Sequence, residues 1–185
     1  MLKRLLRRNK IIDISWHPSL ISHFSEVLKP KVYAEIGIYE GETFNLIDAP
    51  KKYAVDISDI ALNSIPDNGS TVKVLGTSKT LAEVLLMGDV RIDLIFIDAN
   101  HDKKEVIQDF VNLEPFFSEE CIVLFHDTYP KNIEYAESRF CGDAYAAIPA
   151  LAEKYTNWAF VNIPIHPGLT IASRSPLYPN WLRAK

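Results

Sequence analysis

The chain has 185 residues, of which 48% are hydrophobic and 24% charged, and its formal net charge is −4. A chain of this length can bury one proper core, so we expect a single domain over residues 1–185. The composition excludes a disordered chain, and no run of about 18 apolar residues suggests a transmembrane segment. The acidic balance argues against nucleic acid as the main partner, because phosphate backbones need a basic surface.

The first ten residues, MLKRLLRRNK, are a basic exception. They can form a short amphipathic helix with weak contact to a membrane surface, although a solvated helix is the plainer interpretation. No apolar stretch follows that would make them a signal peptide. Cys121 and Cys141 lack the spacing of a disulfide or metal motif, which suits a reducing compartment. We therefore expect a cytoplasmic protein whose residues 1–30 are an N-terminal helical extension.

Short β-branched and aromatic runs alternate with longer helical stretches, a pattern typical of parallel strands joined by crossover helices. Two of the runs, IDLIFID and CIVLFHD, are almost continuously apolar, as strands covered on both faces should be. The predicted strands are Val32–Ile36, Lys52–Asp56, Thr71–Leu75, Ile92–Asp98, Cys121–His126, Trp158–Ile163 and Leu169–Ser173. The predicted helices are Pro18–Leu28, Glu42–Ile47, Thr80–Met87, Lys103–Leu113 and Ile148–Tyr155.

Two connections refine this pattern. The dozen or so residues between the second and third strands leave room for a single helical turn only. Pro167 and Gly168 predict a tight turn between the last two strands, which must then be antiparallel. The fold class expected is a Rossmann-like α/β sheet, parallel through five strands and ending in an antiparallel hairpin.

Polar and glycine-rich loops follow three of the predicted strands. The sequence EIGIYEG, residues 35–41, ends the first strand and enters a helix, so its backbone N–H groups face the sheet edge where such folds bind ligands. Asp56 ends the second strand, where a carboxylate can accept both hydroxyls of a ribose. Gly76, Thr77 and Ser78 follow the third strand. Each signal alone could be a turn or a helix cap, but their order on one edge indicates a nucleotide-like ligand.

These motifs resemble the class I S-adenosylmethionine-dependent methyltransferases from about Val32 to Ser173. YAEIGIYEGETF is similar to their first motif, YAVDIS to their ribose-binding motif and VLGTS to their adenine-side loop. The pair IDLIFIDANHDKKEVIQDF and CIVLFHDTYP is the most specific part, and it resembles the small-molecule O-methyltransferase branch, methyltransferase family 24. The seven-stranded sheet of that family, with its antiparallel last strand, agrees with the predicted hairpin.

The resemblance implies S-adenosylmethionine as cofactor and a hydroxyl of a small molecule, such as a sugar or natural product, as acceptor. Backbone around Gly37 would meet the methionyl carboxylate, Asp56 would hold the ribose, and Asp98 would lie between cofactor and acceptor. The cofactor-binding residues implied are Glu35, Gly37, Gly41, Asp56, Gly76, Thr77, Ser78 and Asp98.

Chemistry is expected at the ends of the fourth and fifth strands. In related enzymes, strand-end carboxylates matching Asp98 and Asp127 hold a divalent cation, here Mg²⁺ or Mn²⁺, but His126 stands where some of them carry a second acid. Without a metal, Asp98, His101 or His126 would remove the acceptor proton. Asp102 is better explained as a helix cap.

Residues 128–150 follow the fifth strand and can cover an acceptor, although an ordered surface excursion explains them equally well. Two other functions stay open at this point. One is a nucleotide-dependent oxidoreductase, which shares the acid after the second strand, and the other is a non-catalytic nucleotide-binding domain of the same fold. The sequence does not indicate an oligomeric state.

Overall fold

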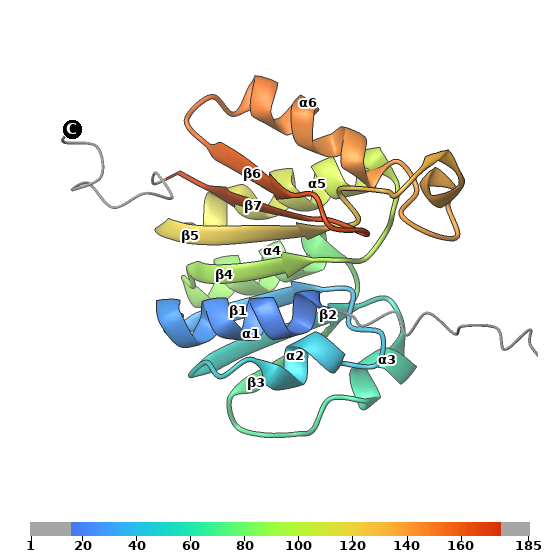
Figure 1. Ribbon diagram of the computed structural model, residues 1–185. Helices are drawn as coiled ribbons and strands as arrows, with labels where there is room; N and C mark the ends of the chain where they lie inside the picture. Colours follow the sequence, from blue (N-terminus) through green and yellow to red (C-terminus); the bar gives the residue numbers. More distant parts are fainter. Residues whose placement is uncertain (1–15, 175–185) are drawn as a thin grey trace, which may run out of the picture.

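The computed structural model describes residues 16–174, so the predicted basic segment Met1–Lys10 lies outside the described residues. A seven-stranded sheet forms the centre, with helices on both faces (Figure 1). The strands are β1 (Val32–Ile36), β2 (Lys51–Asp56), β3 (Thr71–Leu75), β4 (Ile92–Ile97), β5 (Phe117–His126), β6 (Ala159–Ile163) and β7 (Leu169–Ser173). The predicted fold class is confirmed.

The sheet has the order β3-β2-β1-β4-β5-β7-β6. Strands β1 to β5 pair in parallel, whereas β7 lies antiparallel between β5 and β6. The predicted hairpin of β6 and β7 is therefore present. Its second strand, β7, lies next to β5, and β6 forms the edge of the sheet. The order reverses direction at β1, which neighbours both β2 and β4, and ligands bind open α/β sheets in the crevice at such a switch point.

Two layers of helices cover the sheet. The helices are α1 (His17–Leu28), α2 (Glu42–Leu46), α3 (Asp59–Asn63), α4 (Ser78–Gly88), α5 (Lys103–Leu113) and α6 (Ala147–Lys154), with 3₁₀ turns at Glu114–Phe116, Ile133–Ala136 and Ala144–Ala146. Helices α1, α2 and α3 pack on one face and α4, α5 and α6 on the other, and Figure 1 shows α1 and α2 in front of the sheet with α4 and α5 behind it. The short α3 is the single turn expected between β2 and β3.

The two cores follow from the alternation of side chains along the strands. Ala34 and Ile36 of β1 face the α4–α6 layer, and Tyr33 of the same strand faces the α1–α3 layer. One boundary differs clearly from the prediction, because β5 begins at Phe117 and not at Cys121. Phe117 is buried and packs edge-on against Phe110 and Trp158, which extends the strand through residues that look polar in sequence.

No helix among residues 16–174 is long and apolar enough to cross a membrane.

Candidate active site

A cavity of about 780 Å³ opens at the carboxyl edge of the sheet, beside the switch point. Its walls come from the loops that follow β1, β2, β3 and β4 and from one side of α5. The lining includes Gly37, Asp56, Gly76, Thr77, Ser78 and Ala99. A cavity of this size lies within the range of small-molecule and cofactor sites.

Gly37 lets two of these loops approach each other closely. Its φ of 89° lies in the left-handed region, and an added Cβ would stand 2.6 Å from Ala99 Cα and closer still to the Asp98 carbonyl oxygen. No side chain fits there. The loop after β4 is therefore held directly against the glycine loop, with Asp98 N donating to Ile36 O at 2.8 Å.

Asp56 holds the glycine loop in place from the end of β2. One carboxylate oxygen accepts from Ile38 N at 2.8 Å, and the other accepts from Ser58 N at 2.8 Å. The oxygen that accepts from Ile38 also accepts from Tyr39 N at 3.4 Å, so these bonds fix the orientation of Asp56 and leave the second lone pair of Oδ1 as acceptor capacity.

The hydroxyls after β3 are already engaged with protein groups. Thr77 is the N-cap of α4, and its backbone N–H donates to the Thr80 hydroxyl at 3.3 Å. Ser78 is buried, accepts from Asn112 Nδ2 at 2.9 Å and donates to Asp109, whose pKa burial nevertheless raises to about 6. These residues shape the cavity wall, and their direct role toward an adenine stays a prediction.

Three predicted cofactor residues do not line the cavity: Asp98, whose side chain contacts His126, and Glu35 and Gly41. Glu35 is buried, accepts from Tyr33 Oη at 2.5 Å, and has a pKa that burial raises to about 8 against the lowering effect of that hydrogen bond. Gly41 is the left-handed N-cap of α2, where an added Cβ would stand 2.5 Å from Ile65 Cδ1. Glu35 is thus engaged with Tyr33 and Gly41 is packed against Ile65, and their predicted role toward the cofactor stays a prediction.

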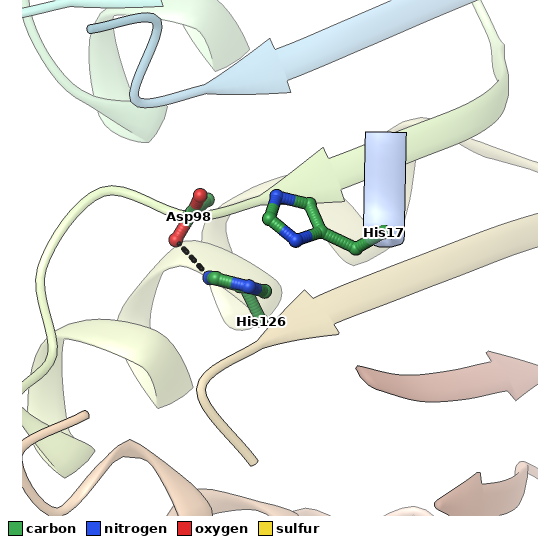
Figure 2. Close-up of side chains that lie close together, drawn as sticks. All are labelled: His17, Asp98 and His126. Carbon is green, nitrogen blue, oxygen red and sulfur yellow. Dashed lines mark hydrogen bonds and ion pairs between the residues drawn. The ribbon is translucent and has the colours of Figure 1, made fainter. Parts of the chain in front are cut away.

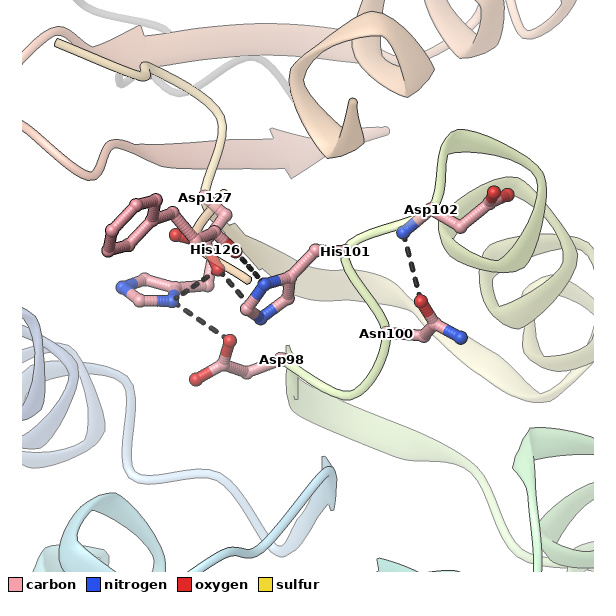
Figure 3. Close-up of polar contacts among 7 residues, drawn as sticks. Asp98, Asn100, His101, Asp102, His126 and Asp127 are labelled. Carbon is pink, nitrogen blue, oxygen red and sulfur yellow. Dashed lines mark hydrogen bonds and ion pairs between the residues drawn. The ribbon is translucent and has the colours of Figure 1, made fainter. Parts of the chain in front are cut away.

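Two aspartates and two histidines gather at the ends of β4 and β5 (Figure 3). His126 Nδ1 lies between two carboxylates, 2.8 Å from Asp98 Oδ1 and 3.4 Å from Asp127 Oδ2. His101 Nε2 lies 3.0 Å from the same oxygen of Asp127. Within this cluster His101 also lines the cofactor-sized cavity, so it connects the two regions.

The charged groups of this cluster shift one another's pKa values. Burial on its own would lower the pKa of His126, but Asp98 and Asp127 outweigh that effect and raise it to about 10. Burial would likewise raise the pKa of Asp127, whereas hydrogen bonding and attraction to His126 hold it below its usual value. A proton on His126 thus offsets the repulsion between the two carboxylates.

The segment after β5 packs directly on this cluster. The Cys141 thiol donates to Asp127, and the Phe140 carbonyl oxygen accepts from His101 Nδ1. An added Cβ on Gly142 would stand 2.9 Å from His101 Cβ. Residues 128–150 therefore help to hold the cluster, while their predicted contact with an acceptor stays a prediction.

Asp102 is a helix cap, as the sequence indicates. Its side chain accepts from Lys104 N at 2.8 Å at the start of α5, and its own N–H donates to Asn100 Oδ1 at 3.1 Å (Figure 3).

The sequence analysis missed His17, which the first turn of α1 brings into the same region (Figure 2). Its ring centroid lies 4.1 Å from that of His126 and 5.8 Å from that of Phe96. Burial and the nearby His126 charge lower the pKa of His17 to about 3, so the ring is neutral at physiological pH. Cys141 was also not considered for the site. Neither residue carries a motif, and only tertiary packing places them here.

Mg²⁺ or Mn²⁺ was predicted at Asp98 and Asp127, but for Mg²⁺ these residues do not offer the oxygen-only surroundings that this ion prefers. The imidazole of His126 contacts both carboxylates, and His101 contacts Asp127 as well. This donor set fits Mg²⁺ poorly, and the reaction proposed for the site does not require this ion.

Comparison with known proteins identifies the family. A search of curated proteins gave no match to the sequence. Among solved structures, an SAH-bound methyltransferase from Podospora anserina is 17% identical with a TM-score of 0.67, covering 86% of this chain and 78% of that one. An O-methyltransferase from Bacillus cereus in complex with SAH is 12% identical with a TM-score of 0.67 (85% and 80% covered). The O-methyltransferase TomG from Streptomyces achromogenes, involved in tomaymycin synthesis and solved with SAM, is 12% identical with a TM-score of 0.64 (85% and 78% covered). These likenesses show the fold. The family model described as a methyltransferase domain matches residues 34–128, a little over half of the sequence, and the chain therefore belongs to that methyltransferase family.

Proposed function

We propose that this methyltransferase transfers the methyl group of S-adenosylmethionine to a hydroxyl of a small molecule such as a sugar or natural product. The observation that carries the proposal is the cavity lined by Gly37 and Asp56, which shares His101 with the carboxylate–imidazole cluster. The SAM- and SAH-bound states of the similar structures support the choice of cofactor.

The cofactor would lie along the ends of β1 to β4. Asp56 would accept from the ribose through its remaining acceptor capacity, and the backbone around Gly37 would meet the carboxylate of the methionyl part. The wall formed by Gly76, Thr77 and Ser78 borders the adenine. The loop that joins Asp98 to His101 lines the cavity through Ala99, Asn100 and His101, and it would hold the methyl-bearing end of the cofactor beside the cluster.

Methyl transfer from a sulfonium is an in-line displacement, so the alignment of acceptor oxygen, methyl carbon and sulfur supplies much of the rate. The acceptor hydroxyl must also lose its proton. His101 is the cluster residue that reaches the cavity, and we assign proton removal to the Asp127–His101 pair: the acceptor hydroxyl takes the place of Asp127 beside His101 Nε2 and gives its proton to that nitrogen. Phe140 orients this ring through Nδ1, and Asp127 stabilises the imidazolium that forms.

The Asp98–His126 pair has a positioning part in this mechanism. The backbone of Asp98 itself touches Gly37, so the carboxylate of Asp98 fixes where the cofactor ends and the acceptor begins. The segment 128–150, which already holds Asp127 and His101, is the proposed cover of the acceptor. We further propose a cytoplasmic protein without a nucleic acid partner, in line with its buried free cysteines and acidic charge.

Titration calorimetry of the purified protein with S-adenosylmethionine, S-adenosylhomocysteine and NAD, each with and without EDTA, tests the proposal. We expect both sulfur ligands to bind in the micromolar range, about −8 kcal/mol, with or without EDTA, and NAD not to bind. Binding of NAD alone would favour an oxidoreductase. Binding of none of the three would leave the cavity without its proposed cofactor.

A further inference from the structure

The ring of His17 lies beside Asp98 and His126 although the three residues are far apart in the chain. His17 comes from the first turn of α1, Asp98 follows β4, and His126 ends β5 (Figure 2). One potential ligand atom from each residue lies within 4.8 Å of the other two. Two ligands about 2.1 Å from one ion are at most about 4.2 Å apart, so side-chain shifts of roughly half an ångström would close the group around an ion.

Helix α1 holds His17 in this place by packing and by hydrogen bonds. Pro18 and Ile21 are buried, and Ser25 Oγ donates to Asp48 O at 3.3 Å. The residue before His17 is anchored as well, because Trp16 Nε1 donates to His166 O at 3.1 Å. The position of His17 is therefore part of the fold.

The chemistry of the three side chains selects a class of ion. Two imidazoles and one carboxylate form the donor set of many divalent transition-metal sites, whereas Mg²⁺ and Ca²⁺ prefer oxygen. His126 Nε2 is buried without a hydrogen-bond partner among the described residues, and a buried polar atom of this kind calls for an explanation. The hydrogen bond between His126 and Asp98 uses the other ring nitrogen, Nδ1, so Nε2 is available as a ligand atom.

A second group, Asp98, His101 and Asp127, meets the same distance limit, but its side chains are already engaged in contacts with other protein groups. His101 uses both ring nitrogens, one toward Phe140 O and the other toward Asp127. Asp127 also accepts from the Cys141 thiol. An ion in this group would have to break several of these contacts.

From these contacts we infer that His17, Asp98 and His126 form a binding site for a divalent transition-metal ion such as Zn²⁺, Co²⁺, Ni²⁺ or Fe²⁺. Three protein ligands leave further coordination positions open, which is typical of catalytic and not of structural metal sites. The inference does not depend on the methyl-transfer proposal, because metal binding can be measured without cofactor or acceptor.

The test uses full-length protein stripped with EDTA and titrated with Co²⁺, followed by visible absorption and calorimetry. We expect one Co²⁺ per chain, displaced by Zn²⁺ and not by millimolar Mg²⁺. His17→Ala should weaken Co²⁺ binding by about tenfold to a hundredfold or more. Loss of a residue that only orients a metal ligand typically costs that much, and loss of a ligand itself should cost no less. The matched control is His23→Ala on the same helix, whose exposed ring pairs with Glu26, and it should bind Co²⁺ as the unmodified protein does.

Thermal unfolding of the metal-free variants, with His17→Asn as a second substitution, separates loss of a ligand from loss of the fold. The inference is overturned if the unmodified protein binds no Co²⁺, if Mg²⁺ displaces it, or if folded His17→Ala and His17→Asn bind it undiminished. It is also overturned if His101→Ala abolishes binding while His17→Ala does not, since the ion would then occupy the second group.

Discussion

Replacing Gly37 by alanine should damage both the fold and the cofactor site, because this glycine is where the loops after β1 and β4 touch. A residue other than glycine in the left-handed region costs about 1–3 kcal/mol. The new Cβ would also stand 2.6 Å from Ala99 Cα, and overpacking of this kind typically costs about 1–3 kcal/mol more. With roughly 2–4 °C per kcal/mol for a domain of this size, Tm should fall by at least about 5 °C.

The same substitution should weaken S-adenosylmethionine binding at least tenfold, or about 1.4 kcal/mol, because Gly37 and Ala99 both line the cavity and must move apart. Differential scanning calorimetry and titration calorimetry measure the two effects. The control is Gly69→Ala, whose Cβ would meet nothing within 4 Å, and it should leave both quantities nearly unchanged. An unaltered Tm for Gly37→Ala would refute the close-approach argument, and an unaltered affinity would separate this loop from the cofactor.

Three further substitutions test other parts of the site. Asp56→Ala should weaken cofactor binding by about 1.5–3 kcal/mol, the usual loss of charge-assisted hydrogen bonds, and unchanged affinity in a folded variant would refute the ribose assignment. Asp127→Asn should lower turnover much more than cofactor affinity, because Asp127 contacts His101 and does not line the cavity; equal losses in a kinetic and calorimetric comparison would contradict this. Glu35→Gln should stabilise the protein more at pH 9 than at pH 5. The folded pKa of Glu35 is raised from 4.5 to about 8, so the folded state keeps a proton that the unfolded state releases, and stability falls as pH rises through that window. Urea unfolding measures the change in free energy of unfolding that Glu35→Gln causes at each pH. An equal change at pH 5 and pH 9 would show that Glu35 is not buried as a neutral acid.

The strands and their directions could be predicted from sequence because the signals for them are local. The apolar runs of β4 and β5 indicate strands covered on both faces, and the turn at Pro167 and Gly168 reverses the chain before β7. Parallel strands place their carboxyl ends at one edge of the sheet. On this basis Asp98, His126 and Asp127 were expected to lie close together, and in the structure they do.

The contacts that the sequence did not reveal come from distant segments that pack side by side. The first turn of α1 meets His126 only because buried residues such as Ile21 seat that helix on the sheet beside Phe96. The hydroxyl of Ser78 looked available to a ligand, yet Asn112 and Asp109 of the neighbouring helix engage it. The spacing of apolar residues predicts which face of a helix is buried. It does not predict which partner each polar side chain contacts.

Two glycines hold the loop from Asp98 to His101 from opposite sides. Gly37 touches its start and Gly142 its end, both with φ values that disfavour other residues, and at neither contact is there room for a Cβ. The start of this loop borders the cofactor cavity, and its end carries the base proposed for the reaction. Because backbone contacts without side chains leave little freedom, the distance from the methyl donor to His101 is set by the fold. That arrangement suits a displacement whose rate depends on alignment, since an error of about 1 Å in such a site can cost on the order of a hundredfold in rate.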